Sequence, residues 1–204
     1  AIWSVTASWF FPAALPTAYS LRAWGRIDTL APALLNSLGL AVAASLLATG
    51  IVLLMVVLND KGKRPLLRLA IYAPLLVPQV SLVLGLQAVL VWFWLDGTWL
   101  AMLWIHALFI CPFAYLIIAP AAAAIDRRYI AVAASLGARP GSRYLRVALP
   151  MLAPAITTAL FVGVSVSVAL YLPSLFAGGG RITTVTLEAM ALGSGGSRQM
   201  AGVA

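Results

Sequence analysis

The sequence predicts an all-α membrane protein, a polytopic bundle of helices, because the chain is very apolar and its few charges lie in short segments. Hydrophobic residues make up 63% of the 204 residues and charged residues only 9%, and the mean hydropathy is +1.04. A soluble domain carries about 25% charged residues to cover its surface. The net charge of +8 does not form a basic face on a soluble fold. We therefore expect the lipid bilayer, and no nucleic acid, as a partner.

Four apolar runs are long enough to cross a bilayer, which takes about 20 residues. They cover residues 36–58, 69–95, 98–122 and 151–176. Pro74 and Pro78 lie inside the second run and are expected to kink it, because proline removes a backbone donor. Pro150 precedes the fourth run, at a first turn where proline is tolerated. The first 16 residues are apolar but too short to span, so we expect the outer end of a further helix there, in a protein of about six spans.

The distribution of positive charge predicts the orientation. The segments after the first and third runs hold Lys61, Lys63, Arg64, Arg68, Arg127, Arg128, Arg139, Arg143 and Arg146. The positive-inside rule places both segments in the cytoplasm, and residues 15–35 and 177–204 in outer loops. Between the second and third runs, Trp92, Trp94 and Trp99 surround a predicted turn at Asp96-Gly97, as in an aromatic belt at the outer interface.

The apolar runs lack the residues that would couple transport to an ion gradient. They contain no Asp, Glu, Lys or Arg, and His106 is the one side chain in them that titrates near neutral pH. The chain also lacks the Gly-x4-Gly-Lys-Ser/Thr pattern of a phosphate-binding loop. One histidine, the single Cys111 and five acidic residues provide neither a nucleophile and base pair nor a metal site. We therefore expect no enzyme activity, no metal and no bound cofactor, and place any ATP on another subunit.

The basic segment at residues 123–150 is predicted to contain two short helices. Asp126 is suited to cap the first helix, which reaches Leu136. Gly137 is suited to end it in the left-handed conformation. Pro140 is suited to open the second helix, of about two turns.

The second short helix is expected to end at Leu149-Pro150 and to present a mixed surface. Tyr144 and Val147 share one flank, and Arg143 and Arg146 occupy another. An exposed aromatic side chain beside basic ones suits insertion into a groove on a partner protein.

The spacing of this segment resembles the cytoplasmic loop of the permeases of binding-protein-dependent ABC importers, which have the type I fold. The family pattern is Glu-Ala-Ala-x3-Gly-x9-Ile-x-Leu-Pro. On this chain it falls on Ala133, Gly137, Val147, Leu149 and Pro150. The motif's glutamate position is occupied by Ala131 and its first alanine by Val132, so the salt bridge that the family's glutamate makes is not available from this position.

The resemblance implies a role and a set of partners. Residues 1–204 would form one transmembrane permease domain in the bacterial inner membrane and perform no covalent chemistry. A second permease unit, as a homodimer, a heterodimer or a fused half, would complete the pathway. A periplasmic solute-binding protein would deliver the solute, and a cytoplasmic ATPase dimer would bind ATP and magnesium.

The resemblance also assigns a coupling helix, Arg139 to Val147, that docks into the ATPase. The residues implied in this coupling loop are Ala133, Gly137, Arg139, Pro140, Arg143, Tyr144, Val147, Leu149 and Pro150.

The transported solute is predicted only by class. The tail from residue 172 to 196 most resembles permeases assigned to thiamine, in a wider group that carries ferric iron, sulfate and polyamines. Candidate pathway residues are Gln79, Gln87, His106, Ser165 and Ser167. Each also has a structural explanation, since serines in a span often bond their own helix and a histidine can join helices.

Two other functions remain open at this point. An ion-coupled secondary transporter would also have kinked apolar spans, but it needs a carboxylate inside the membrane. A membrane structural or assembly subunit would explain the uncharged spans, but it gives no reason for the spacing between Gly137 and Pro150.

Overall fold

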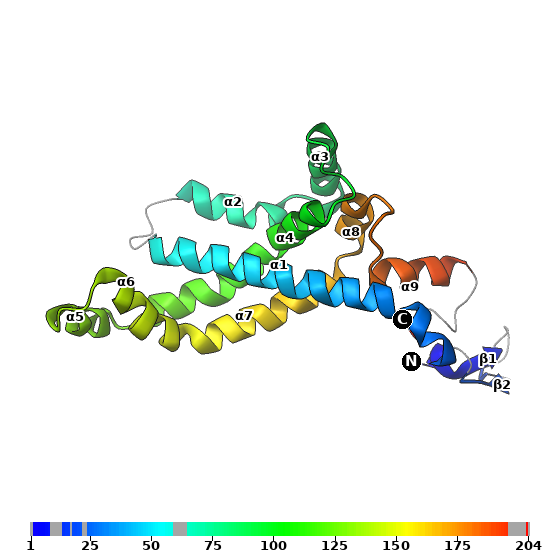
Figure 1. Ribbon diagram of the computed structural model, residues 1–204, viewed down its shortest axis with the longest axis horizontal. Coiled ribbons are helices and arrows are strands. Elements are labelled where there is room, and N and C mark those ends of the chain that lie inside the picture. Colours follow the sequence, from blue (N-terminus) through cyan, green and yellow to red (C-terminus); the bar gives the residue numbers. More distant parts are fainter. Residues whose placement is uncertain are drawn as a thin grey trace.

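Three long helices form the frame of the protein in the computed structural model, which describes residues 2–8, 14–16, 18–21, 24–58, 65–195 and 203. They are α1 (Ala31–Leu58), α4 (Trp99–Ala124) and α7 (Leu149–Ala169). All three run along the long axis of the molecule (Figure 1). Each is long and apolar enough to cross a membrane. The predicted all-α, polytopic architecture is thereby confirmed, and the first and third predicted spans correspond to α1 and α4.

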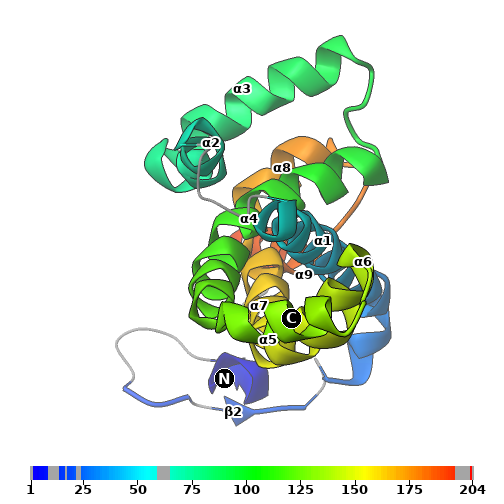
Figure 2. The ribbon, with the colours of Figure 1, turned by 90° about the vertical axis from the view of Figure 1, so that its left-hand side faces the viewer.

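The second predicted span, residues 69–95, is not one helix. It is divided into α2 (Pro65–Leu76) and α3 (Gln79–Trp92), whose axes differ by 111°. Pro78 has an extended conformation, with φ −52° and ψ 127°, and proline also disfavours the helical conformation in the residue before it. Pro74 lies within α2 and does not end it. As a result α3 turns away from the bundle that α2 follows (Figure 2).

The fourth predicted span, residues 151–176, is also broken. The helix α7 ends at Ala169 because Leu170 is extended, with ψ 93°, and α8 (Tyr171–Gly178) then begins in a new direction. Gly179 and Gly180 have positive φ values of 52° and 72° and lead the chain towards α9 (Val185–Ser194).

The N-terminal residues differ from the expected helix end. The described part consists of η1 (Ile2–Val5), the antiparallel strands β1 (Thr6–Ser8) and β2 (Ala18–Tyr19), and η2 (Trp24–Thr29). Thr6 in β1 and Tyr19 in β2 are residue types enriched in strands. This small hairpin lies at the end of the molecule opposite α5 (Figure 1).

The predicted turn between the second and third runs is confirmed. Gly97 has φ +66°, and its amide donates to the carbonyl of Ala177 at 2.9 Å. A Cβ atom at Gly97 would also lie 2.9 Å from Cδ of Arg181. Trp92 and Trp94 on the approach to the turn are 82% and 88% exposed, as an aromatic belt facing lipid headgroups requires.

Close packing of α1, α4 and α7 depends on small residues. Ala44 and Ala48 of α1 are fully buried against α4, and Gly163 of α7 faces Ser45 of α1 and Ile110 of α4. A Cβ atom at Gly163 would overlap the Ser45 hydroxyl and lie 2.9 Å from Cγ2 of Ile110. The absence of a side chain therefore sets the distance between these helices.

A chain of hydrogen bonds joins α4 to both sides of the break at Leu170. His106 is 1% exposed; its Nδ1 lies 2.7 Å from Oγ of Ser167, and its Nε2 lies 3.1 Å from Oγ of Ser174. Because the Ser174 hydroxyl donates to the Leu170 carbonyl, it can only accept from the histidine. Nε2 therefore carries a proton and donates to the Ser174 hydroxyl, and the Nδ1 contact joins the ring to Ser167.

Substitution of Gly163 is expected to separate the long helices. Gly163→Val should lower the free energy of unfolding by about 1–3 kcal/mol through overpacking, measured as a lower Tm in detergent. Gly50→Ala is the matched control, because a Cβ at Gly50 meets nothing within 4 Å. Gly163→Ala should also lower the Tm, and adding Ser45→Ala should restore part of that Tm, because it removes the hydroxyl that a Cβ at position 163 would overlap. An unchanged Tm for Gly163→Val would show that Gly163 does not set the helix spacing.

Loss of the histidine is expected to destabilise the fold. His106→Leu leaves the buried Ser167 hydroxyl without its partner, which costs about 1–3 kcal/mol, whereas Ser174 keeps its bond to the Leu170 carbonyl. Ser167→Ala should lower Tm, whereas Ser165→Ala should not, because Ser165 is exposed and bonds only the Phe161 carbonyl of its own helix. Equal Tm values for the two serine variants would refute the bracing role of His106.

Candidate functional site

The segment between α4 and α7 begins with the first of the predicted short helices, α5 (Arg127–Ser135). Asp126 caps it, since its carboxylate accepts from the Arg128 amide at 2.8 Å. Its contact with the Arg128 guanidinium is long, at 3.9 Å, and exposed, so it adds little stability. Gly137 then has φ +78°, and the amide of Ala138 bonds the Ala133 carbonyl at 3.0 Å. The predicted cap and left-handed end are both confirmed.

The second predicted short helix is not separate. It begins with α6 (Pro140–Arg143), passes through a π turn, η3 (Tyr144–Ala148), and continues without interruption into α7. Ala148 and Leu149 both have helical dihedral angles, and the Leu149 amide bonds the Tyr144 carbonyl. Leu149-Pro150 therefore does not close a helix. Pro150 lies at the start of α7, directly after the π turn, and the helix continues there although Pro150 has no amide to donate.

The side chains on this continuous helix also differ from the prediction. Tyr144 is half-buried and lines a cavity instead of being exposed. The Arg143 Nε donates to the Ala138 carbonyl at 2.7 Å, which fixes the turn after Gly137. Val147 is half-buried, whereas Arg139 and Leu149 are exposed. The stretch from Arg139 to Val147 thus joins the loop to α7, and α5 is the short helix that stands apart.

One exposed apolar surface of the loop lies on α5 and the residue that follows it; further along, Leu145 is also exposed, at 66%. Tyr129, Val132 and Leu136 are 57%, 58% and 81% exposed. Their spacing of three and four residues places them on one face of a helix. We call these three residues the α5 stripe. Sequence reasoning missed this stripe, although its helical spacing is readable, because spacing alone does not show which face of a short helix is covered by the bundle.

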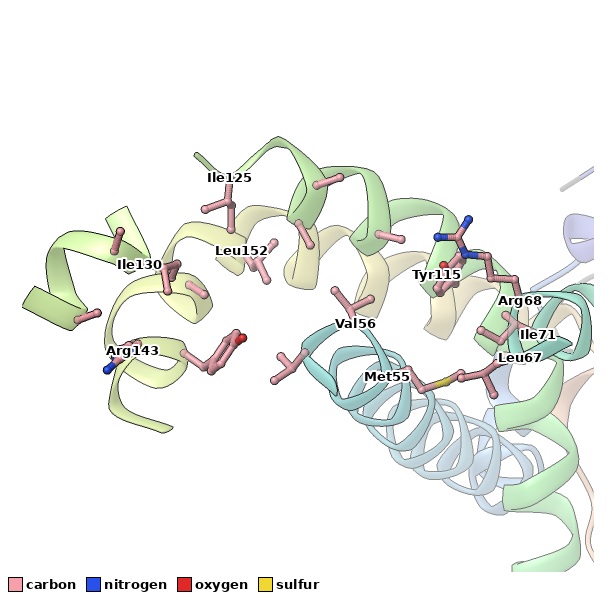
Figure 3. A pocket seen from close by; sticks show the side chains of 18 residues that line it. Met55, Val56, Leu67, Arg68, Ile71, Tyr115, Ile125, Ile130, Arg143 and Leu152 are labelled. Carbon is pink, nitrogen blue, oxygen red and sulfur yellow. The ribbon is translucent and has the colours of Figure 1, made fainter. Parts of the chain in front are cut away.

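Behind α5 lies an open cavity of about 700 Å³ at one end of the bundle. Its walls come from the end of α1, the start of α2, the end of α4, α5, and the helix from Arg143 to Leu152. Ile130 and Ala134, on the face of α5 opposite the stripe, contribute to the wall (Figure 3). The end of α1, the start of α2 and the α4–α7 connection therefore lie at the same end of the molecule, as the charge distribution predicted.

The candidate pathway residues do not gather at one place. His106 and Ser167 bond each other inside the bundle, and Ser165 is exposed and bonds its own helix. Gln87, on α3, has a buried Oε1 without a hydrogen-bond partner in the described part of the chain. Sequence reasoning missed Ser174, which bonds the same histidine.

Gln79 occupies a different environment, beside both breaks in the apolar helices. It lines an open groove of about 610 Å³ between the α2–α3 bend and Leu170 at the α7–α8 break. Phe109 and Phe113 of α4 line the same groove. Gln79 is the polar side chain at this otherwise apolar surface.

Comparison with known proteins identifies the family. Residues 47–195 match the family described as binding-protein-dependent transport system inner membrane component. Over 165 residues the chain is 36% identical to the inner membrane ABC transporter permease protein YnjC of Escherichia coli (strain K12); this covers 81% of the chain and 32% of that relative. The chain thus spans about a third of the length of the curated relative it matches.

The matched region includes α2 to α9 and the C-terminal part of α1, so it contains the broken spans, the α5 stripe and the Gly137 turn. The resemblance stated from the spacing between Ala133 and Pro150 is confirmed. The chain belongs to the family of binding-protein-dependent transport system inner membrane components, the membrane permease subunits of ABC importers.

Proposed function

We propose that this permease is driven by a separate cytoplasmic ATPase, which docks on the α5 stripe. The observation that supports this most strongly is the exposure of Tyr129, Val132 and Leu136 on a short helix at the tip of the bundle. Fully burying one such side chain contributes about 1.5–3 kcal/mol. Three of them on one face are a binding surface for the groove of a soluble partner.

The location of α5 supports a soluble partner rather than lipid. It lies at the extreme end of the long axis, beyond the ends of the three long helices (Figure 1). The positive-inside rule favours the cytoplasm for that end, because arginines surround it. ATP and magnesium would be bound there by the ATPase, since this chain has no phosphate-binding loop.

A rigid connection would carry movement of α5 into the membrane. The turn at Gly137 is held by the Arg143 bond to the Ala138 carbonyl, and from Pro140 the backbone is helical as far as Ala169. A displacement of α5 therefore acts on the end of a continuous helix of the transmembrane bundle. We assign the docking role to α5 and the transmitting role to Arg139–Val147, in place of the docking helix expected there from the sequence.

The solute and the remaining partners are proposals of the same kind. We infer a small solute of the thiamine, iron, sulfate and polyamine group, delivered by a periplasmic binding protein to the end that holds α9. The groove beside Gln79 lies where two helices are interrupted. Interrupted helices in membranes are found where they line a cavity or are buried in protein, so this groove is a candidate part of the pathway, completed by a second permease unit.

A charge on the α5 stripe should prevent docking. Leu136→Asp should reduce co-purification of the ATPase and ATP-dependent uptake by tenfold or more, because a hot-spot side chain contributes about 2 kcal/mol. Leu136→Met is the matched control, since it keeps an apolar side chain at the same exposed position. Wild-type uptake by Leu136→Asp at equal membrane levels would exclude the stripe as the docking surface.

The orientation can be measured with two single cysteines. In a Cys111→Ala background, Ser135→Cys beside the stripe should react with an impermeant maleimide only after cells are opened. Thr183→Cys, exposed at the opposite end, should react in intact spheroplasts. The reverse labelling pattern would show that α5 faces outward and would rule out docking of a cytoplasmic ATPase.

A further inference from the structure

The cavity behind α5 has a chemical character that ATPase docking does not use. Its eighteen lining residues include Arg68, Arg143, Tyr115 and Tyr144, and none is acidic. The other lining residues are aliphatic, from alanine to isoleucine, leucine and methionine. The cavity thus combines an apolar interior with positive charge at its edges.

The polar groups lie at the borders of this apolar space. Arg68 lies near Tyr115 on one side, Arg143 lies on the other, and Val56, Ile130 and Leu152 lie between them (Figure 3). The guanidinium of Arg68 is exposed and has no hydrogen-bond or ion-pair partner in the described part of the chain. Within the described residues nothing competes with an anion for it, whereas the Arg143 Nε is already bonded to the Ala138 carbonyl.

The location of the cavity favours a membrane lipid over other amphipathic anions. It lies between the ends of α1, α2, α4 and α7, at the end of the bundle where apolar spans give way to the arginine-rich connections. Acyl chains and phosphate groups of the bilayer meet at this depth. Basic pockets between transmembrane helices on the cytoplasmic side are suited to anionic headgroups.

We propose that this cavity binds an anionic phospholipid, with its phosphate at Arg68 and the upper part of an acyl chain against the apolar wall. The cavity is open, so the remaining chain length extends into the bilayer. The volume of about 700 Å³ is within the range of sites that bind small amphipathic ligands, about 300–1,000 Å³.

Such a lipid would touch both the docking loop and the spans. Ile130 and Ala134 belong to α5, and Met55 and Leu67 to α1 and α2. A bound lipid fills the space between these elements and limits how far α5 can move towards them. Lipid binding does not require an ATPase, so the lipid-binding proposal can be tested independently of the docking proposal.

The test uses the complete permease, delipidated in detergent and then mixed with phosphatidylglycerol or phosphatidylcholine. Native mass spectrometry measures how much of each lipid the permease retains. The wild type should retain phosphatidylglycerol several times better than phosphatidylcholine. Arg68→Gln should weaken phosphatidylglycerol retention about fivefold, the effect of about one basic side chain near an anionic lipid. Arg146→Gln removes an equal charge from the segment between α4 and α7, outside the cavity wall, and should retain the preference.

A second pair of variants tests the cavity itself. Ala122→Leu fills the wall and should reduce retention, whereas Ala124→Leu, on the same helix but outside the wall, should not. The proposal is overturned by equal retention of the two lipids, by equal losses in Arg68→Gln and Arg146→Gln, or by displacement of the lipid with free phosphate. No lipid retained by the wild type would mean that another protein segment fills the space, and would overturn it too.

Discussion

Inside a bilayer, backbone amides and carbonyls have no water to bond, and this constraint governs where the helices of the protein are allowed to break. The break at Leu170 shows how the requirement is met. Its amide bonds the Ser167 carbonyl at 3.2 Å, and its carbonyl accepts from the Ser174 hydroxyl. His106 then links both serines to α4, so the interruption of one helix is held by a side chain from another.

The same constraint explains how much of the fold the sequence predicts. Hydropathy finds the spans, because a run of apolar residues must be helical in lipid, and local capping rules find α5, because Asp126 and Gly137 act on their immediate neighbours. The breaks at Pro78 and Leu170 are less predictable. Pro74 and Pro78 are the same residue type four positions apart, yet only Pro78 ends its helix. The local signal for the break at Leu170 is Pro173, which has no amide to bond the Ala169 carbonyl, but Pro74 shows that such a proline does not always end a helix.

The candidate site, like the fold, was predictable only in part. The spacing from Ala133 to Pro150 identified the loop and its family, since a family pattern records positions rather than contacts. It did not reveal that the backbone stays helical through Pro150, because a π turn depends on packing around Tyr144 and not on a turn residue. Nor did it reveal which face of each helix is covered. Tyr144, expected to be exposed, is half-buried, whereas Tyr129, Val132 and Leu136 before or beside Gly137 are exposed.

Gly163 has a consequence for how sequences of this fold diverge. The spacing of α1, α4 and α7 is set there by an absent side chain, with Ser45 and Ile110 filling the space up to the backbone. A larger residue at position 163 is compatible only with smaller ones at positions 45 and 110, which come from two other helices. These three positions are thus expected to vary as a unit among related chains, although more than 50 residues separate each from the next.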